Sequence, residues 1–344
     1  MLDNQNGFEA PSLITGMSPM KNFLRKKLRD SNSEALGSSL IKVVRLITAV
    51  TKSPPPDFIR AVVATGLPID PLGKETRLPT IDIVIPFVEK DIRVLKYCVE
   101  SVTQNVRNPI ACIRLITPAD KTGNQAIFKE EGSQDLLTDV LKSYPNVKLE
   151  FDHSVLGPKI FGEISRNFPG GWVVQQLVKF AACLNSASSA SLIVDADTVL
   201  LSPKTWLAEG GTQLLQVAHE YENRYLGHIR DFFSLEKSLL LSFVTHHSLF
   251  QKDVVELMFP HGKDSLFEWW TGSTDKDQTF LSEFETYGSF LYERYPERVA
   301  LGSWSNLLSP YFAKFENELE KKERKPSEIL EDYCSVSFHA HCQA

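Results

Sequence analysis

The sequence predicts an α/β fold in which a mainly parallel central sheet is covered by helices on both faces. Between residues 80 and 201, short apolar runs of strand length alternate with stretches whose apolar residues recur at helical spacing. The most apolar of these runs, residues 191–194, leads directly into Asp195-Ala196-Asp197, and continuous apolar runs are typical of strands buried on both faces. Because such sheets bind ligands beyond the carboxyl ends of their strands, we expect a site there.

The expected elements follow one another in regular order. Residues 81–86 read Ile-Asp-Ile-Val-Ile-Pro, which is typical of a strand. Residues 91–102 then place Ile92, Leu95 and Val99 at helical spacing. Further strands are expected at 112–117, 147–151, 191–194 and 198–201, and further helices at 136–143 and 172–184. Residues 242–250 are expected to form a strand or a loop.

Composition excludes several classes of protein. The net charge of −6 gives no general attraction to nucleic acid or to an anionic membrane, and no run of about 18 apolar residues is present to span a membrane. The five cysteines are an odd number and widely spaced, so they predict neither a disulfide framework nor a zinc site. The polar, acidic start of the chain is not a secretory signal. We therefore expect a cytoplasmic protein with no nucleic-acid partner and no transmembrane segment.

The chain divides near residue 75. Residues 1–37 are polar with a local basic patch, which is typical of a partly disordered or loosely attached segment. Residues 40–50 bring Ile41 and Val44 together at helical spacing, so a short amphipathic helix is expected there. Packing against the main domain accounts for this helix, and a weak peripheral membrane contact is the alternative. Residues 76–344 are expected to form a single domain.

Asp195 and Asp197 are the strongest candidates for a metal site. They are one residue apart, so in extended chain their side chains would leave on the same side. Carboxylate oxygens suit Mg²⁺ or Mn²⁺, which keep open positions for substrate phosphates. A second pair, Asp275 and Asp277, lies in a polar run with no strand before it. The alternative for the first pair is a solvated acidic turn at a strand end.

The helix expected at 172–184 is mostly apolar but has one polar stripe. The stripe consists of Gln175, Gln176 and Lys179. Lys179 follows the two glutamines by four and three positions, a spacing that places all three on one face of the helix. A strip of solvent-exposed side chains is one explanation. The other directs Lys179 to a phosphate or a sugar hydroxyl.

Two pairs of side chains further along the chain have both structural and functional explanations. His246 and His247 are adjacent in a possible strand, so at most one of them points into a crevice, as a base or as a hydrogen-bonded structural group. Trp269 and Trp270 suit a sugar-stacking surface, although core packing explains them equally well.

Glu283 and Glu285 begin the helix that Ser282 is expected to cap. Ser282 and Glu285 match a capping box, in which glutamine would also serve at the second position. Glu283 would stand in the first turn, where the helix dipole favours its charged form. At least one of the two glutamates is a candidate for accepting a proton from a hydroxyl or for binding an acceptor.

The C-terminal tail alternates strictly between apolar and polar residues over 335–342, which predicts an edge strand. His339 and His341 lie on its polar face. Exposure to solvent explains them, and completion of a metal site with Asp195 and Asp197 is the alternative.

Taken together, these motifs resemble a little-characterised bacterial group of glycosyltransferases with the GT-A fold. The resemblance covers residues 81–304 or so and is carried by Val84-Ile85-Pro86 with Glu89 and Asp91, by the Gln175, Gln176 and Lys179 helix, by residues 192–197, by 243–250 and by 282–288. It implies that Asp195 and Asp197 bind a divalent metal that holds the diphosphate of a nucleotide sugar. It also implies that Pro86, Phe87 and Glu89 lie at the nucleotide site. The His-x-x-Gly-x-x-Lys signature of some retaining relatives is absent, and Glu283 is the nearest candidate for the base of inverting ones.

The resemblance therefore implies a metal-dependent transfer from a UDP- or GDP-sugar to a hydroxyl acceptor such as a glycan. It divides the domain into a donor-binding half, residues 76–205, with Gln175, Gln176 and Lys179, and an acceptor half, 206–344, with His246, Trp269 and Trp270. His247 joins Glu283 and Glu285 as a catalytic candidate. A sugar nucleotidyltransferase would want a Gly-rich loop after the first strand, and a dinucleotide oxidoreductase would want G-x-G-x-x-G there; neither is present. A non-catalytic carbohydrate-binding or scaffold protein would tolerate loss of the acidic pair, which is intact.

Overall fold

The structure is a computed structural model that describes the central part of the chain with short gaps. The described residues are 41–42, 63–64, 66–119, 126, 128–167, 171–218, 222–239, 241–272, 281–309, 312–313, 315–317 and 333–338. The N-terminal segment 1–37, most of the helix expected at 40–50 and the second acidic pair, Asp275 and Asp277, lie outside them.

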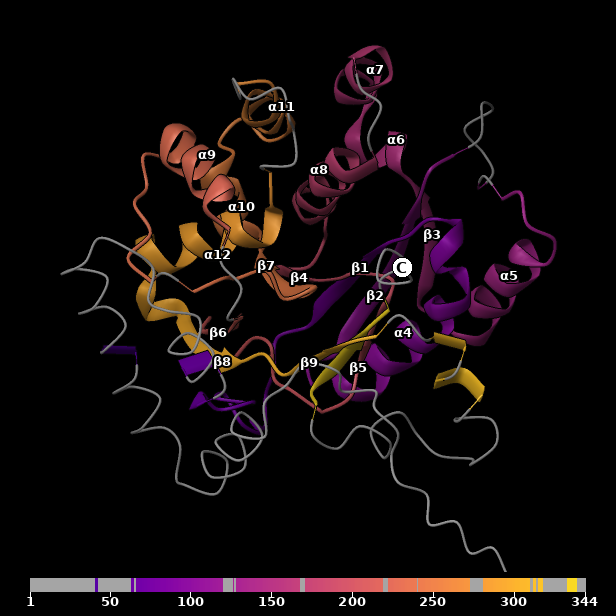
Figure 1. The fold of residues 1–344 in the computed structure, drawn as a ribbon, viewed down its shortest axis with the longest axis horizontal. Coiled ribbons are helices and arrows are strands. Elements are labelled where there is room, and N and C mark those ends of the chain that lie inside the picture. The colour runs from indigo at the N-terminus through magenta and orange to yellow at the C-terminus, as the bar shows by residue number, and fades with distance from the viewer. Residues whose placement is uncertain are drawn as a thin grey trace, which may run out of the picture.

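A five-stranded sheet forms the centre of the fold, in the order β3-β2-β1-β4-β7 (Figure 1). Strands β1 to β4 run parallel, and β7 pairs antiparallel with β4. Their bounds are β1 Ile81–Pro86, β2 Ile110–Thr117, β3 Val147–Phe151, β4 Ala190–Val194 and β7 His247–Gln251. The expected α/β class with a mainly parallel sheet is therefore confirmed.

Helices cover both faces of this sheet. Successive strand residues point to opposite faces, so each face has its own hydrophobic core beneath its helices. Ile81, Ile83 and Ile85 pack with α4 (Ile92–Asn105) and α5 (Ser133–Ser143). Val84 on the same strand packs with the opposite layer, whose central helix is α8 (Gly171–Leu184). That layer also contains α6 Asp152–Leu156, α7 Pro158–Asn167, α9 Asn223–Phe233, α10 Lys252–Met258, α11 Lys263–Thr271 and α12 Glu283–Arg294.

Two small sheets complete the described fold. One has the order β5-β10-β9, with β5 Thr198–Leu200, β9 Asn306–Leu308 and β10 Ser335–Ser337. The other pairs β6 Gln213–Val217 with β8 Val299–Ser303 in parallel. Short 3₁₀ turns occur at η1 Glu89–Asp91 and η3 Pro296–Arg298. None of the described helices is long and apolar enough to cross a membrane.

The C-terminal strand lies inside its sheet, so the expected edge strand is wrong. β10 pairs antiparallel with β5 and parallel with β9, and Ser335 and Ser337 are fully buried. The Ser337 hydroxyl lies 2.8 Å from the Thr198 hydroxyl, so buried polar partners replace the solvent that the alternating pattern suggested. This pairing brings the tail directly beside the acidic turn that follows β4.

Candidate active site

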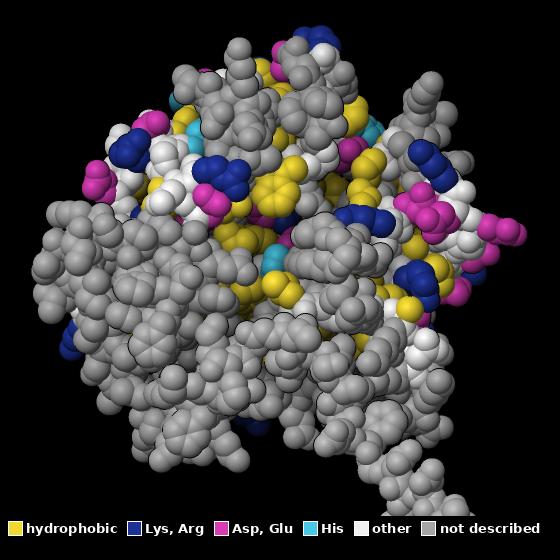
Figure 2. Space-filling model, viewed as in Figure 1, with side chains coloured by type: hydrophobic (Ala, Val, Ile, Leu, Met, Phe, Trp, Pro, Cys, Tyr) yellow, Lys and Arg dark blue, Asp and Glu magenta, His cyan; other side chains and the backbone are white. Residues whose placement is uncertain are grey.

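The candidate site lies at the carboxyl edge of the central sheet. The four parallel strands all end at this edge, and β7, which runs the opposite way, begins there. Phe87 follows β1, Asp152 follows β3, Asp195 follows β4, and His246 precedes β7. In the middle of the face in Figure 2, apolar side chains and a histidine reach the surface between charged groups. The topology thus gathers side chains that are far apart in the sequence.

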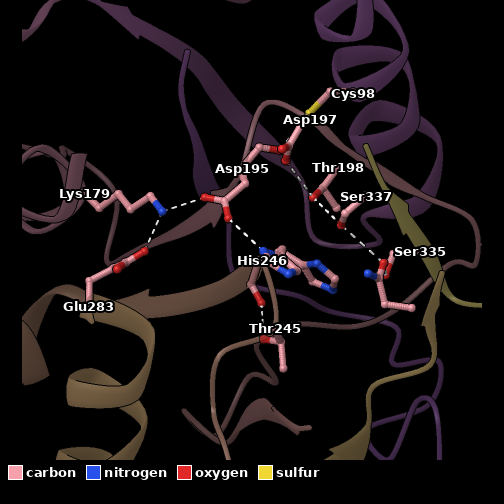
Figure 3. A network of polar contacts seen from close by, with 12 residues as sticks. Cys98, Lys179, Asp195, Asp197, Thr198, Thr245, His246, Glu283, Ser335 and Ser337 are labelled. Atoms are coloured by element: carbon pink, nitrogen blue, oxygen red, sulfur yellow. Dashed lines mark hydrogen bonds and ion pairs between the residues drawn. The ribbon is translucent and has the colours of Figure 1, made fainter. Parts of the chain in front are cut away.

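Asp195 and Asp197 stand on a tight turn, which changes the geometry expected for extended chain. The Thr198 N–H donates to the Asp195 carbonyl at 2.9 Å. Figure 3 shows the Asp195 carboxylate directed toward Lys179 and His246, and the Asp197 carboxylate on the other side of the turn near Cys98 and Thr198. The expectation that both side chains leave on the same side is therefore wrong, because the chain turns at the end of β4.

Lys179 from α8 bridges two carboxylates. Its Nζ lies 2.6 Å from Asp195 Oδ1 and 2.5 Å from Glu283 Oε1 (Figure 3). Burial opposes the charge of the ammonium, but Asp195 and Glu283 outweigh it and raise the pKa of Lys179 above its usual value. Burial likewise opposes ionisation of Asp195, yet Lys179 and then His246 hold the pKa of this carboxyl well below its usual value. Asp195 is therefore charged and neutralised by a fixed cation.

Glu283 is the first residue of α12 and is held by its backbone as well as by its side chain. Ser282 caps this helix by accepting the Glu285 N–H, and the Glu283 N–H donates to Gln176 Oε1 at 2.9 Å. The side chain is almost completely buried, and burial raises the pKa of Glu283 while Lys179 opposes that rise. Such a carboxylate is more basic than an exposed one, which suits a group that accepts a proton.

His246 faces the acidic turn from the start of β7. Its Nδ1 lies 3.2 Å from Asp195 Oδ2, and its carbonyl accepts the Asp195 N–H at 2.9 Å. The backbone of His246 has a φ of 59°, in the left-handed region that few residues other than glycine adopt. Strained backbone of this kind is often found at functional sites, and here it turns the histidine toward Asp195.

An apolar cavity of about 380 Å³ opens beside this cluster. Pro86, Phe87 and Gln175, which were expected at the donor site, all line it. Its other lining residues come from the ends of β1 and β2, from the start of α6 and from α8: Val88, Lys90, Ile116, Thr117, Pro118, Asp152, Gly171, Trp172, Val174 and Val178. This volume is within the range of small-molecule sites, roughly 300–1,000 Å³.

Glu89, Gln176 and Lys179 do not line this cavity. The Glu89 carboxylate accepts the N–H groups of Lys129 and, at 2.7 Å, Glu130, so it braces a loop. Gln176 is buried and holds the backbone of Glu283, and Lys179 holds two carboxylates. All three were expected to contact the donor. In this structure Gln176 and Lys179 instead position the acidic groups of the site.

His247, Trp269 and Trp270 are buried away from the crevice, which corrects the catalytic and acceptor-binding roles expected for them. The His247 ring is fully buried and lies edge-on to Trp206, 5.4 Å between ring centroids. Burial and then the charge of Lys204 hold the pKa of His247 well below its usual value. Trp269 and Trp270 belong to the core around α8. His246 lies before β7 in a left-handed conformation and faces Asp195, whereas His247 is the first residue of the strand and lies in the core against Trp206.

Glu285 also lies outside the crevice. Its carboxylate forms an ion pair with the buried Lys237 and accepts the Phe243 N–H at 2.9 Å and the Ser289 hydroxyl at 3.0 Å. These partners account for the side chain as a structural group that ties α12 to the segment before β7. A catalytic role for Glu285 is therefore not supported.

Asp152 and Trp172 are cavity residues that the sequence reasoning did not single out. Asp152 directly follows the strand at 147–151, so the rule that drew attention to Asp195 applied to it as well. Trp172 begins the helix that carries the polar stripe, and it is 46% exposed. An exposed tryptophan beside a predicted site is a signal that the sequence alone could not provide.

A divalent cation fits part of this arrangement. Among the described residues, no three His, Cys, Asp or Glu side chains are grouped to hold one metal ion. The carboxylate of Asp195 is engaged by Lys179 and His246, and the carboxylate of Asp197, on the other side of the turn, accepts the Thr198 hydroxyl at 3.5 Å. Burial raises the pKa of Asp91 to about 6, with further contributions from the negative charges of Asp197 and Asp195. These acids therefore concentrate negative charge near the turn, although no three described side chains form a complete set of metal ligands.

The described tail approaches Asp197 at a specific residue. The Phe338 N–H donates to the Asp197 carbonyl at 2.9 Å, one residue before His339 in the chain. His339 and His341, the two predicted metal ligands of the tail, lie outside the described residues.

No protein-family model matches the sequence, and no curated protein is similar to it. Among solved structures, the apo form of mouse xyloside xylosyltransferase 1 is similar over 77% of this chain and 99% of its own, with 11% identity and a TM-score of 0.41. The galactosyltransferase LgtC in complex with donor and acceptor sugar analogues is similar over 77% of this chain and 91% of its own, with 11% identity and a TM-score of 0.39. An active-site mutant of LgtC has the same coverage, with 12% identity and a TM-score of 0.44. At these identities and scores, substrate and chemistry have to be argued from the residues of this chain.

Proposed function

We propose that this protein is a glycosyltransferase that moves a sugar from a nucleoside-diphosphate sugar to a hydroxyl acceptor. The observation that carries the proposal is the cluster of Asp195, Lys179 and Glu283 at the carboxyl edge of the sheet, beside an apolar cavity large enough for a nucleoside. The cavity suits the base and ribose, and the acidic turn would hold the diphosphate through a divalent cation, because carboxylates alone would repel it. The motifs that resemble GT-A glycosyltransferases fall at the same edge.

The buried carboxylates fit the charges that develop in this reaction. The acceptor oxygen forms a bond to the anomeric carbon while the bond from that carbon to the diphosphate oxygen breaks, and the electron pair leaves with the nucleoside diphosphate. In our proposal Glu283 accepts the proton of the acceptor hydroxyl and then releases it to solvent. Lys179 holds Glu283 in one orientation, and fixed charges in a buried site stabilise a transition state more than solvated charges do. In the same proposal His246, which contacts Asp195 on the side away from Lys179, hydrogen-bonds a hydroxyl of the acceptor.

We further propose that Mn²⁺ or Mg²⁺ binds at Asp197, with His339 or His341 as candidate additional ligands. When bound, such an ion neutralises the charge that develops on the leaving diphosphate. Support comes from the hydrogen bond that brings Phe338, and so the start of the tail, to Asp197. Asp195 supports the site by fixing Lys179 and His246 around the turn.

The direct test is a panel of nucleotide sugars incubated with and without Mn²⁺. We expect one of them to be hydrolysed slowly, or transferred to an added glycan, with release of nucleoside diphosphate and a product mass higher by one sugar. A sugar nucleotidyltransferase would instead consume or release pyrophosphate, so assaying both products distinguishes the two activities. The proposal fails if no nucleotide sugar is turned over or bound under either condition.

A further inference from the structure

The apolar cavity contains a nearly buried carboxylate, Asp152, that could select the base of the donor. We propose that the Asp152 carboxylate reads the nucleobase, and that it favours a base with a ring N–H on its pairing edge, namely guanine or uracil, over adenine and cytosine. This inference rests on the proposed function, because it assigns the cavity to the nucleoside part of a nucleotide sugar.

The walls of the cavity suit a flat aromatic ring. Phe87 and Val88 from the end of β1, Ile116 from β2 and Val178 from α8 are apolar. Trp172 is 46% exposed, and its Nε1 donates to the Leu281 carbonyl at 3.1 Å, which fixes the plane of the indole ring. Aromatic side chains held in this way stack on bases of any identity. The walls therefore explain binding of a base but not the choice of base.

Asp152 supplies the selectivity that the walls lack. Among the lining residues that the structure describes, it is the one carboxylate, and only 6% of the residue is exposed. Its Oδ1 accepts the His153 N–H at 2.7 Å, and a backbone hydrogen bond from Ala119 adds to the constraint. An ionised carboxylate only accepts hydrogen bonds, so its fixed oxygens require donors on the ligand. A base that presents a hydrogen-bond acceptor at this position would leave the buried Asp152 carboxylate unpaired, which weakens binding.

Bases differ in what they offer to such an acceptor. Guanine presents two neighbouring donors, a ring N–H and an amino group, and uracil presents one ring N–H. Adenine and cytosine present an amino group beside an unprotonated ring nitrogen, whose lone pair would repel a carboxylate oxygen. The chemistry shared by guanine and uracil is thus the ring N–H.

The cavity also lies at the right place along α8. Gln175 and Val178 line the cavity, and Lys179 reaches Asp195. Four residues of helix rise by about 6 Å, so a base in the cavity leaves its ribose and diphosphate near the acidic turn. Asp152 is therefore a specificity-determining residue at the far end of the same ligand from the proposed chemistry.

The first experiment uses the native protein and measures the affinities of nucleoside diphosphates by calorimetry with Mn²⁺ present. We expect GDP or UDP to bind at least tenfold more tightly than ADP and CDP. Methylation of the ring nitrogen, in 1-methyl-GDP or 3-methyl-UDP, should remove this advantage. A weaker affinity for IDP, which lacks the amino group of guanine, would assign guanine as the base; a preference for UDP over GDP would assign uracil.

The second experiment uses variants of the cavity. Asp152→Asn keeps the shape and adds an amide donor, so we expect it to reduce the preference for the ring N–H at least tenfold. Trp172→Ala should weaken all four nucleotides together, and Asp139→Asn, the same change at an exposed position of α5, should alter nothing. Equal affinity for all four bases in the native protein, or an unchanged preference in folded Asp152→Asn, overturns the role of Asp152 and leaves the proposed function intact. If no nucleoside diphosphate binds at all, the proposed function fails first.

Discussion

Lys179 Nζ lies 2.6 Å from Asp195 Oδ1 at the end of β4, and the same ammonium lies 2.5 Å from Glu283 Oε1 at the start of α12. The ammonium also sits over the Phe284 ring, 4.4 Å from its centroid. One buried cation thus joins a helix, a strand end and a second helix. This contact sets the relative positions of the two carboxylates that the proposed reaction needs.

Lys179→Met should destabilise the fold as well as the site. Without the ammonium, Glu283 becomes a buried charge without its cation and the half-buried Asp195 loses one partner, which costs roughly 3–5 kcal/mol of the free energy of unfolding. Denaturant titration measures this loss, and Lys142→Met on the exposed side of α5 is the matched control. The double variant Lys179→Met, Glu283→Gln should recover part of the loss, since it removes one uncompensated charge. A single-variant loss below 1 kcal/mol would contradict the buried ion pair.

Glu283→Gln should abolish the proposed proton transfer while keeping the shape of the site. Glutamine cannot accept the proton, so the chemical step should slow by roughly 10²-fold or more while donor binding persists. Single-turnover kinetics with the preferred nucleotide sugar measure this, and Glu268→Gln on the surface of α11 is the control. Transfer at the native rate by Glu283→Gln would remove this glutamate from the mechanism.

Glu285→Gln should be a stability variant with normal chemistry per folded molecule. The sequence suggested a mild effect, because glutamine serves equally well in a capping box. The structure instead pairs Glu285 with Lys237, and both side chains are nearly completely buried. Leaving Lys237 without its partner should cost roughly 3–5 kcal/mol. Adding Lys237→Met should restore much of that stability, and a failure to do so would show that the backbone and hydroxyl partners of Glu285 matter more than the ion pair.

Asp197→Asn should affect metal dependence more than Asp195→Asn does. The amide is a weaker ligand for a hard cation, so the Mn²⁺ concentration needed for half-maximal stabilisation by a nucleoside diphosphate should rise at least tenfold. In Asp195→Asn, the main expected change is loss of stability, because Lys179 then has only Glu283 as an anionic partner. Equal stabilisation by nucleoside diphosphate in excess EDTA would exclude a metal from donor binding.

The stability of the protein should fall between pH 6.5 and 4 partly because of His228. Burial lowers the pKa of this histidine to about 4, and its ring packs near Trp269. The unfolded chain takes up a proton near pH 6.5 and the folded one does not, so acid favours unfolding over this range. At pH 5 the expected loss relative to pH 7 is about 2 kcal/mol. His228→Phe should remove this part of the pH dependence in denaturant titrations, and an unchanged slope would assign it to other groups.

The sequence predicted which residues belong to the candidate site but not which of them contact one another. Asp195, Lys179 and Glu283 all stood out, because strand ends, polar helix stripes and capped helix starts are local patterns. Which of them touch depends on how α8, β4 and α12 pack, and Lys179 and Glu283 are 104 residues apart. Burial is likewise not readable from local sequence. Trp269 and His247 are residue types found in ligand-binding sites, but both are fully buried here.

The sequence by itself determined the alternation of strands and helices, the parallel sheet and the carboxyl edge at which Asp195 lies, since periodicity over ten to twenty residues encodes these features. Only the tertiary structure decided that β10 enters the middle of a sheet beside Asp197, that Lys237 neutralises Glu285, and that Asp152 lines a cavity. The physical reason is that burial and ion pairing depend on the distances between elements, and those distances are fixed when the two cores pack against the sheet.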